Sequence, residues 1–312
     1  MDRELLPTDS SHVQNEELST LMATMNDSQS TLEVNLQRFR DNDLDYYDAK
    51  QDESDIVHYY RNIDLTSQNP KQLFQALKGL LTETHHTEIR YRRESDKHLK
   101  SLVDLHPDGT FRSLYSGKEA DPLTVLKSDQ AFMQQISMQE LTSGIENYPL
   151  NIEHVVPQSY YGKQEPMRGD LHHLFYCEIP CNTHRGNKSY EDYPDYNPER
   201  TLQRDTIRHD CGKETGNDAL AGGEFEPEYG KGLVARATLY FLLRHGDKLL
   251  SQYKTMFNVQ VLLDWHNQHP PNLLYEKHRN QTIFRIQGNR NPLIDKPELA
   301  EQIDFSAFSK LH

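Results

Sequence analysis

The part of the sequence between residues 151 and 190 concentrates side chains that can carry out hydrolysis. Its central pair is Glu153 and His154, which are adjacent in the segment EHVVPQS. A neutral imidazole, with a pKa of about 6.5, can take a proton from a water molecule that attacks phosphorus. A carboxylate can hold a hard divalent cation, which neutralises charge developing on phosphoryl oxygens. The segment therefore predicts metal-assisted hydrolysis of a phosphodiester.

Two short strands and a helix are expected to position these side chains. Residues Ile152 to Val156 favour a strand that Pro157 ends, and Leu171 to Phe175 favour a second strand. A helix carrying Asn182 and Arg185 follows the second strand. The expected order is therefore strand, loop, strand, helix.

The strand geometry constrains how the central pair can work. Adjacent side chains of a regular strand point to opposite faces, so Glu153 and His154 can serve one site only where the strand frays or bends. Pro157 provides such an end three residues later.

Three motifs give this part of the chain a resemblance to a known family. They are EHVVPQS, then PMRGDLHHLF, and then the spacing N-x-x-R-x-N. In these motifs the sequence resembles the endonuclease I family of secreted and periplasmic bacterial nucleases, and the likeness runs from about residue 58 to about residue 300. The resemblance implies an α+β fold, a mostly helical domain around a ββα-metal finger motif with a small sheet.

The same resemblance implies roles for individual residues. His154 is expected to be the general base, and Glu153 a ligand of a catalytic Mg²⁺ or Mn²⁺. His173, within DLHHLF, matches the place where the family has its second ligand, often an Asn. Independently of the resemblance, Arg168 or Arg185 is expected to hold a phosphate oxygen, because a guanidinium offers paired donors. The alternative for Arg185 is a structural role, in which it bonds backbone carbonyls of its helix.

The three cysteines of the chain allow three arrangements. Cys177 and Cys181 are spaced C-x3-C beside His184, and Cys211 lies in the segment RHDCGK next to His209. Three thiolates and one imidazole would complete a tetrahedral structural Zn²⁺ site. A disulfide from Cys211 to either of the other cysteines, and three unlinked buried thiols, are the alternatives. Because disulfides are rare in the cytosol, this choice is tied to the compartment.

The negative charge of the chain is concentrated in its N-terminal part. The whole sequence has a net charge of −14, and residues 1–57 hold 14 acidic and 4 basic residues, a net charge of −10. The rest is near balance, with 34 acidic and 30 basic residues. We therefore expect an acidic extension over residues 1–57 and a nuclease-like domain over residues 58–312. The extension is interpreted as a flexible tail, as a segment that binds an inhibitor or partner protein or covers a basic groove, or as a structured accessory element.

Helical spacing recurs on both sides of the central segment. Asn69 marks a helix start, followed by apolar residues from Leu73 to Leu81. Leu233 to Leu243 is typical of a buried helix, in which Arg236 must be paired or face the cleft. A further helix is expected from Tyr275 to Gln287. Apolar residues of the acidic extension favour short amphipathic helices.

The composition also bears on compartment and activity. The N-terminus lacks the basic and apolar regions of a signal peptide, and no run of about 18 apolar residues is present. We therefore expect a protein without membrane contact, either cytoplasmic or exported by a non-classical route. The expected activity is that of a metal-dependent endonuclease with little sequence preference, acting on DNA and, as a second substrate class, on RNA. The alternative is a nucleic-acid-binding module of the same fold whose catalytic site has decayed.

Overall fold

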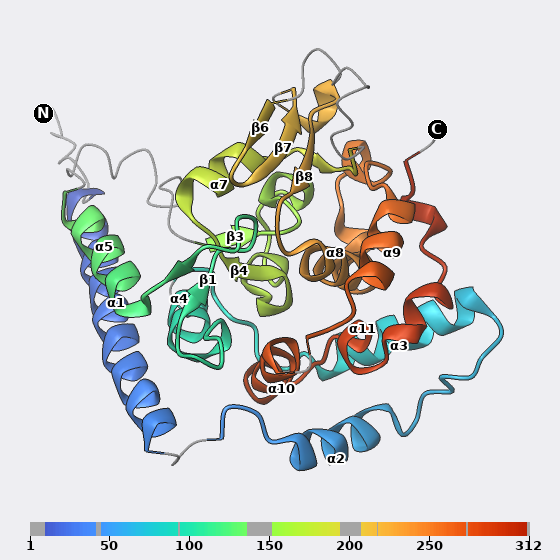
Figure 1. Ribbon diagram of the computed structural model, residues 1–312, viewed down its shortest axis with the longest axis horizontal. Coiled ribbons are helices and arrows are strands. Elements are labelled where there is room, and N and C mark those ends of the chain that lie inside the picture. The colour runs from blue at the N-terminus through green and yellow to red at the C-terminus, as the bar shows by residue number, and fades with distance from the viewer. Residues whose placement is uncertain are drawn as a thin grey trace, which may run out of the picture.

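The computed structural model describes residues 10–41, 45–92, 94–135, 152–193, 207–216, 218–272 and 274–310. Helices predominate in these residues, and small β-sheets lie among them (Figure 1). The expected α+β class is therefore confirmed. Within the same residues, no helix combines the length and the apolar character needed to cross a membrane.

The described residues form the following helices and strands. The α-helices are α1 (Ser10–Arg40), α2 (Ala49–Tyr60), α3 (Pro70–Thr84), α4 (Ser95–His98), α5 (Pro122–Gln135), α7 (Ile179–Arg185), α8 (Lys231–His245), α9 (Val259–Gln268), α10 (Tyr275–Gln287) and α11 (Pro292–Asp295). The strands are β1 (Phe111–Arg112), β2 (Glu119–Ala120), β3 (Ile152–His154), β4 (Leu174–Tyr176), β5 (Ser189–Tyr190), β6 (Ile207–His209), β7 (Gly212–Thr215) and β8 (Glu224–Pro227). They form the pairs β1-β2 and β3-β4 and a sheet of order β5-β8-β7-β6.

The central helix is α8, and its residues are buried on nearly all sides. It packs against α9 and α3, and the main hydrophobic cluster includes residues from all three helices. Arg236 on α8 donates two hydrogen bonds to the Glu276 carboxylate of α10, at 2.6 and 2.9 Å. The interpretation of Arg236 as a paired, structural side chain is therefore confirmed.

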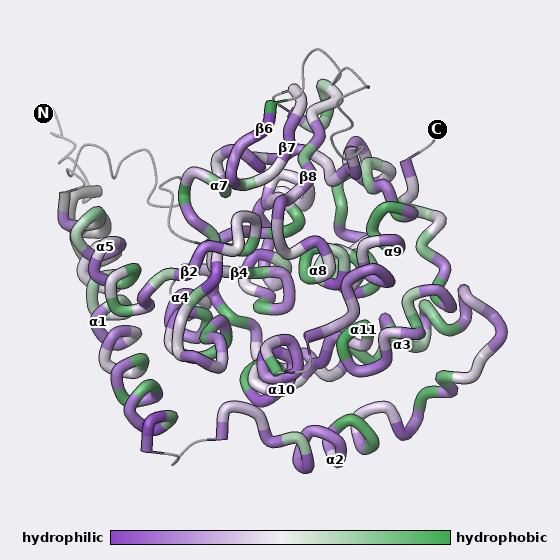
Figure 2. Tube along the Cα trace, in the orientation of Figure 1, coloured by the Kyte–Doolittle hydropathy of each residue, from purple (hydrophilic) through white to green (hydrophobic). Residues whose placement is uncertain are grey.

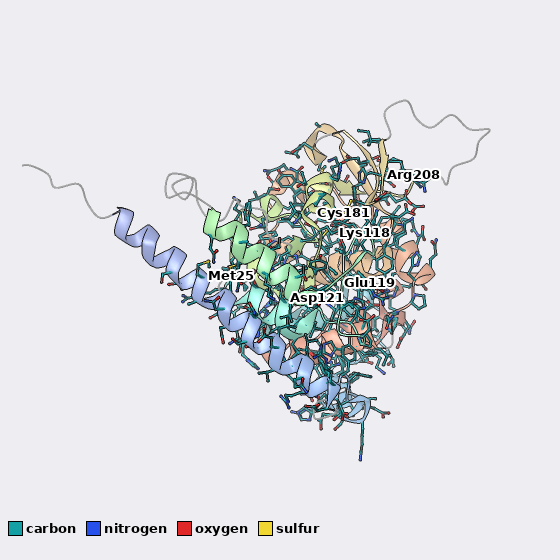
Figure 3. All side chains as sticks on the ribbon, turned by 60° about the vertical axis from the view of Figure 1, so that its left-hand side comes forward. Met25, Lys118, Glu119, Asp121, Cys181 and Arg208 are labelled. Carbon is teal, nitrogen blue, oxygen red and sulfur yellow. A yellow bond between two sulfur atoms is a disulfide. The ribbon has the colours of Figure 1, made fainter. Side chains whose placement is uncertain are left out.

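The first helix is longer and better packed than the sequence suggested. α1 is a continuous helix of 31 residues that runs beside α5 (Figure 3). Hydrophobic positions recur along it among hydrophilic ones (Figure 2). Met25, Ser28 and Leu32 are buried on one face, and Asn35 donates to the carbonyl of Ser101 at 2.9 Å. Short separate helices were therefore the wrong expectation, and residues 19–40 behave as a structured element.

The expected boundary at residue 57 falls inside α2. Asp52 of α2 is fully buried and accepts hydrogen bonds from Arg290 (2.6 Å) and from the Tyr47 hydroxyl (2.8 Å). Tyr60, at the end of α2, donates to Asp295 at 2.9 Å. The sequence does not reveal that Asp52 is buried, because its partner Arg290 lies 238 positions later. The residues before position 58 therefore belong in part to the core of the domain.

Candidate active site

The strand, loop, strand, helix order expected from the sequence is present in β3, β4 and α7. β3 and β4 are antiparallel, and α7 begins three residues after the end of β4. The second strand starts later than expected, because the Asp170 side chain accepts a hydrogen bond from His172 N (3.1 Å) and caps a 3-10 turn, Leu171–His173. From α7, Asn182 donates through Nδ2 to the carbonyl of Ile152 at 2.8 Å. This bond fastens the helix to β3.

Glu153 and His154 point to opposite faces of β3, as regular strand geometry requires. On one face, the Glu153 carboxylate accepts a hydrogen bond from the Tyr115 hydroxyl at 2.6 Å. On the other face, the His154 ring lies edge-on to the Tyr91 ring, with 4.6 Å between the centroids. The site therefore has an acidic side and an imidazole side.

The hydrogen bonding of His154 defines which nitrogen can act as a base. Its Nε2 lies 2.8 Å from the carbonyl oxygen of Arg168, which can only accept, so Nε2 carries the proton. Nδ1 is then the nitrogen with a free lone pair. Burial, together with nearby His173 and the Arg168 guanidinium, lowers the pKa of His154 well below its usual value. The imidazole is therefore neutral and able to accept a proton.

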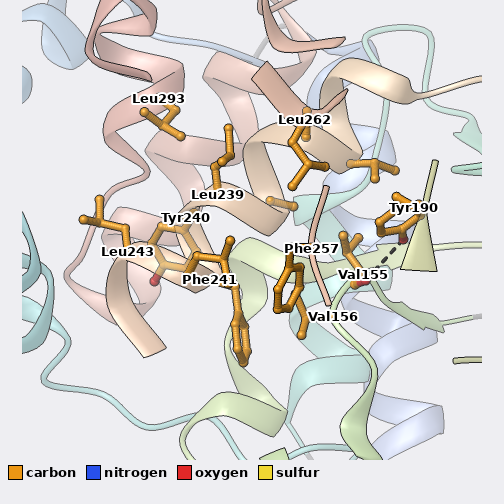
Figure 4. Packing of buried hydrophobic residues seen from close by; sticks show 14 of the residues in the cluster. Val155, Val156, Tyr190, Leu239, Tyr240, Phe241, Leu243, Phe257, Leu262 and Leu293 are labelled. Atoms are coloured by element: carbon orange, nitrogen blue, oxygen red, sulfur yellow. Dashed lines mark hydrogen bonds between the residues drawn. The ribbon is translucent and has the colours of Figure 1, made fainter. Parts of the chain in front are cut away.

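A chain of hydroxyl groups orients Glu153. The Tyr115 hydroxyl donates to Glu153 Oε1 and lies 2.7 Å from the Tyr190 hydroxyl. Tyr190 in turn lies 3.2 Å from the carbonyl oxygen of Val155 (Figure 4). Burial raises the pKa of Glu153 to about 7, although Arg185 and the Tyr115 bond act in the opposite direction. The Tyr115 bond thus holds the Glu153 carboxylate in place, and Arg185 compensates its negative charge only in part.

The acidic side of β3 offers the oxygen ligands that a hard cation needs. Glu153 is 3% exposed, and its nearest cation is Arg185 Nη1, 3.6 Å from Oε1. Asn182 and Arg185 are three positions apart on α7 and so share one helix face. Because Asn182 Nδ2 is bonded to the Ile152 carbonyl, its Oδ1 remains as a potential ligand. A buried carboxylate oxygen and a partly buried amide oxygen are ligand types that fit Mg²⁺ or Mn²⁺.

His173 does not join Glu153. Its Nε2 donates to the carbonyl of Met167 at 2.6 Å, and its ring packs against Phe241 with 4.9 Å between the centroids. The His173 ring also lies 5.4 Å from the His154 ring, which places it on the imidazole side. The two residues expected to share one ion therefore lie on opposite faces of β3. Asn182, which was expected only as part of the following helix, bonds to the carbonyl of Ile152, the residue before Glu153.

Arg185 is placed as a structural residue. Only 2% of its side chain is exposed. Its guanidinium donates to the backbone carbonyls of Val155 (2.7 Å) and Gly186 (3.0 Å) and stacks over the Tyr190 ring at 4.7 Å. A side chain this buried is not available to a large anionic substrate, so the structural alternative fits the geometry better than the phosphate contact.

Arg168 lies on the imidazole side and is only partly buried. Its guanidinium carbon is 4.7 Å from the centre of the Tyr91 ring, and its Nε donates to Gln158 at 2.6 Å. Arg92, which the motifs did not indicate, lies 5.6 Å from the same ring and has a positive φ of 63°. Such a backbone conformation is uncommon for a bulky residue and is enriched at functional sites. In the sequence, the alternation of Arg and Tyr around position 91 could have pointed to Arg92 as a candidate residue of the site.

The cysteines do not form the expected zinc site. Cys181 and Cys211 are joined in a disulfide, with 5.3 Å between their Cα atoms, and this bond links α7 to the turn between β6 and β7 (Figure 3). Cys177 is a free, buried thiol that accepts a hydrogen bond from Ser113 Oγ. Two of the three thiols are consumed, so Cys177, Cys181, Cys211 and His209 cannot be four ligands of one ion. The disulfide alternative with Cys181 is the arrangement found.

Comparisons with known proteins cover most of the chain. The sequence pattern of a family described as Endonuclease I matches residues 66–298. An extracellular ribonuclease of Bacillus amyloliquefaciens is 29% identical over 273 residues, covering 79% of this chain and 89% of the relative. An extracellular deoxyribonuclease of Aeromonas hydrophila is 27% identical over 164 residues, covering 46% of this chain and 65% of the relative. A periplasmic deoxyribonuclease of the same species is 28% identical, with coverages of 46% and 62%.

The hairpin with its Glu and His, the helix that follows it and these relatives together define a nuclease, a hydrolase. The chain belongs to the endonuclease I family.

Proposed function

We propose that this protein is a metal-dependent endonuclease that hydrolyses phosphodiester bonds in DNA and RNA with little sequence preference. The observation that carries the proposal is the bond from His154 Nε2 to the Arg168 carbonyl. It leaves Nδ1 of a neutral imidazole as the proton acceptor, on a strand whose preceding residue, Glu153, is a buried carboxylate.

The residues on the two sides of β3 have different roles in the proposed reaction. His154 takes a proton from the attacking water through Nδ1, and the Arg168 carbonyl keeps the ring in the required tautomer. Arg168, with its guanidinium on the same side, holds a phosphate oxygen. Glu153 and Asn182 would hold Mg²⁺ or Mn²⁺, which when bound neutralises charge on the phosphoryl and leaving oxygens. Tyr115 keeps the Glu153 carboxylate oriented.

Both nucleic acids fit this chemistry. Contacts to phosphate carry no direct information about base sequence, and an activated water needs no hydroxyl on the sugar. The relatives named as a ribonuclease and as deoxyribonucleases support activity on both substrates. Cleavage of RNA by water leaves no 2′,3′-cyclic phosphate, so mass analysis of RNA products tests the mechanism. Cyclic phosphate ends would mean that the sugar hydroxyl, rather than water, attacks phosphorus.

The function is tested by following cleavage of supercoiled plasmid and of a long RNA with Mg²⁺ or with chelator. The wild-type protein should cut both substrates only with the metal, and His154→Ala should lower the initial rate by at least ~10²-fold while DNA binding is kept. His58→Gln, a change at an exposed histidine of α2, is the matched control. Binding without cleavage by the wild-type protein would support the decayed module instead.

The second ligand is tested separately. Asn182→Ala should shift the Mg²⁺ dependence of the rate to higher concentration, because it removes an oxygen donor. His173→Ala should leave that dependence in place and lower thermal stability, because His173 packs in the core. The opposite result, a shift with His173→Ala and none with Asn182→Ala, would restore the ligand pair expected from the sequence.

The disulfide supports a proposal about the compartment in which the protein acts. Such bonds persist in oxidising surroundings and are rare in the cytosol, so the Cys181–Cys211 link supports action outside the reducing cytosol. Intact mass measurement of alkylated protein, with and without prior reduction, tests whether one thiol or three react.

A further inference from the structure

Beside the disulfide, three side chains from separate elements converge. His184 belongs to α7, His209 ends β6, and Glu214 lies in β7. His184 Nδ1 is 3.0 Å from Glu214 Oε1, and His209 Nε2 is 3.5 Å from the same oxygen. One ligand atom from each residue lies within 4.8 Å of the others. Among the described residues, this is the only such group of three or more.

We propose that His184, His209 and Glu214 form a binding site for a transition-metal ion of the zinc class. In tetrahedral zinc sites with bonds of about 2.0–2.1 Å, ligand atoms are separated by roughly 3.3–3.4 Å. The separations of 3.0 and 3.5 Å lie on either side of this value. Two imidazoles and one carboxylate leave the fourth position to water and prefer Zn²⁺ to Mg²⁺.

The burial of the three side chains supports the binding of a metal ion between them. The Glu214 side chain is 9% exposed and that of His209 is 16% exposed, whereas that of His184 is 42% exposed and gives access from solvent. His209 Nε2 is itself buried and makes no hydrogen bond within the described part of the chain. At 3.5 Å, its distance from Glu214 is too long for a good hydrogen bond. A metal ion would give His209 Nε2 the partner that it lacks among the described residues.

Two features of the site limit its affinity. The backbone N–H of Cys211 donates to His209 Nδ1 at 3.1 Å, so Nε2 carries the proton until a metal replaces it. Coordination of a metal through Nε2 moves the proton of the neutral imidazole to Nδ1, which can then no longer accept from Cys211, and the loss of that hydrogen bond lowers affinity by roughly tenfold. Lys188 Nζ, 2.9 Å from Glu214 Oε2, also repels a cation. We therefore expect a micromolar site rather than one as tight as a fully closed structural zinc site.

The position of the site gives the metal a mechanical role. Cys181 lies one turn before His184, and Cys211 lies two residues after His209. The ion would therefore join α7 to the β6-β7 hairpin at the end that the disulfide already holds. Because α7 also carries Asn182, which bonds to the Ile152 carbonyl of β3, the metal would also help to hold this helix against β3.

The test is a zinc titration of the full-length, disulfide-intact protein against a chromogenic chelator, with Mg²⁺ in excess to occupy the oxygen site. The wild-type protein should bind one equivalent of Zn²⁺. His184→Gln and His209→Gln should each weaken binding at least ~10-fold, the scale of one lost ligand or supporting contact. His58→Gln should bind like the wild type. Circular dichroism in chelator checks that each variant is folded.

Cobalt identifies the ligands. Co²⁺ at this site should give the visible absorption of nitrogen and oxygen coordination without sulfur-to-metal charge transfer. Equal zinc affinity of the wild type and the double variant His184→Gln/His209→Gln would overturn the proposal. So would zinc uptake that requires reduction of the disulfide and brings a sulfur-to-cobalt band, because that result would assign the thiols as ligands.

Discussion

Replacing Tyr115 by Phe removes one hydroxyl group from the middle of the chain that orients Glu153. That hydroxyl is 2.6 Å from Glu153 Oε1 and 2.7 Å from the Tyr190 hydroxyl, and the residue is fully buried. A hydrogen bond to a charged group contributes about 1.5–3 kcal/mol. At about 1.4 kcal/mol for each factor of ten, its loss corresponds to roughly 10- to 100-fold. Losses of this size are typical when a partner of a metal ligand is removed.

The loss should appear in the metal dependence of the rate. Plasmid nicking by Tyr115→Phe should need about 10- to 100-fold more Mg²⁺ for half-maximal rate and should approach the wild-type rate at saturating metal. Tyr190→Phe, which removes only the distal link to Val155, should cause a smaller shift. Tyr253→Phe is the control, because it changes a buried tyrosine that stacks on Tyr160 instead.

Two outcomes would refute this reasoning. If the Mg²⁺ curves of Tyr115→Phe and Tyr253→Phe overlay, the hydroxyl does not orient a metal ligand. If Tyr115→Phe lowers the rate equally at every Mg²⁺ concentration while remaining folded, Glu153 acts in the chemical step and not in metal binding.

Three further predictions concern stability, pH and phosphate binding. Asp52→Asn should lower the free energy of unfolding by about 3 kcal/mol in urea titrations, because it leaves the buried charge of Arg290 partly uncompensated. Burial lowers the pKa of His245 from 6.5 to about 4, so between these values the unfolded chain binds a proton that the folded chain excludes. Stability should therefore fall by about 2–3 kcal/mol as pH drops through this window, and His245→Gln should flatten the decline; an unchanged slope would contradict the assignment. Arg168→Gln should weaken DNA binding and reduce its salt slope by about one, whereas Arg185→Gln should mainly lower the melting temperature.

Local signals in the sequence predicted the elements that depend on neighbouring residues. α10 begins at Tyr275 and ends at Gln287, as expected, because Gly288 adopts the left-handed conformation that closes a helix. Asn69 caps α3 by accepting a hydrogen bond from Gln72 N at 3.2 Å. The two strands around Glu153 were also found, although the first ends at His154 instead of Val156 and the second starts at Leu174 instead of Leu171.

Choices that depend on three-dimensional approach were not available from the sequence. The cap made by Asp170 turns the residues after it into a 3-10 turn, which carries His173 to the imidazole side. The choice of Cys181 rather than Cys177 depends on how α7 meets the β6-β7 turn. Tyr115 reaches Glu153 across 38 positions, and no local pattern links such residues.

The pairing of Asp52 with Arg290 has a consequence for synthesis of the enzyme. The two residues are separated by 238 positions, so during translation Asp52 leaves the ribosome long before its partner exists. Contacts between distant parts of a chain form late, after the loop between them has been closed. Until then α2 lacks the cation that permits its burial, and Tyr60 also lacks Asp295. A growing chain that already contains Glu153 and His154 therefore still lacks the partners of Asp52 and Tyr60, and the packing of α2 cannot be completed before Arg290 and Asp295 have been made.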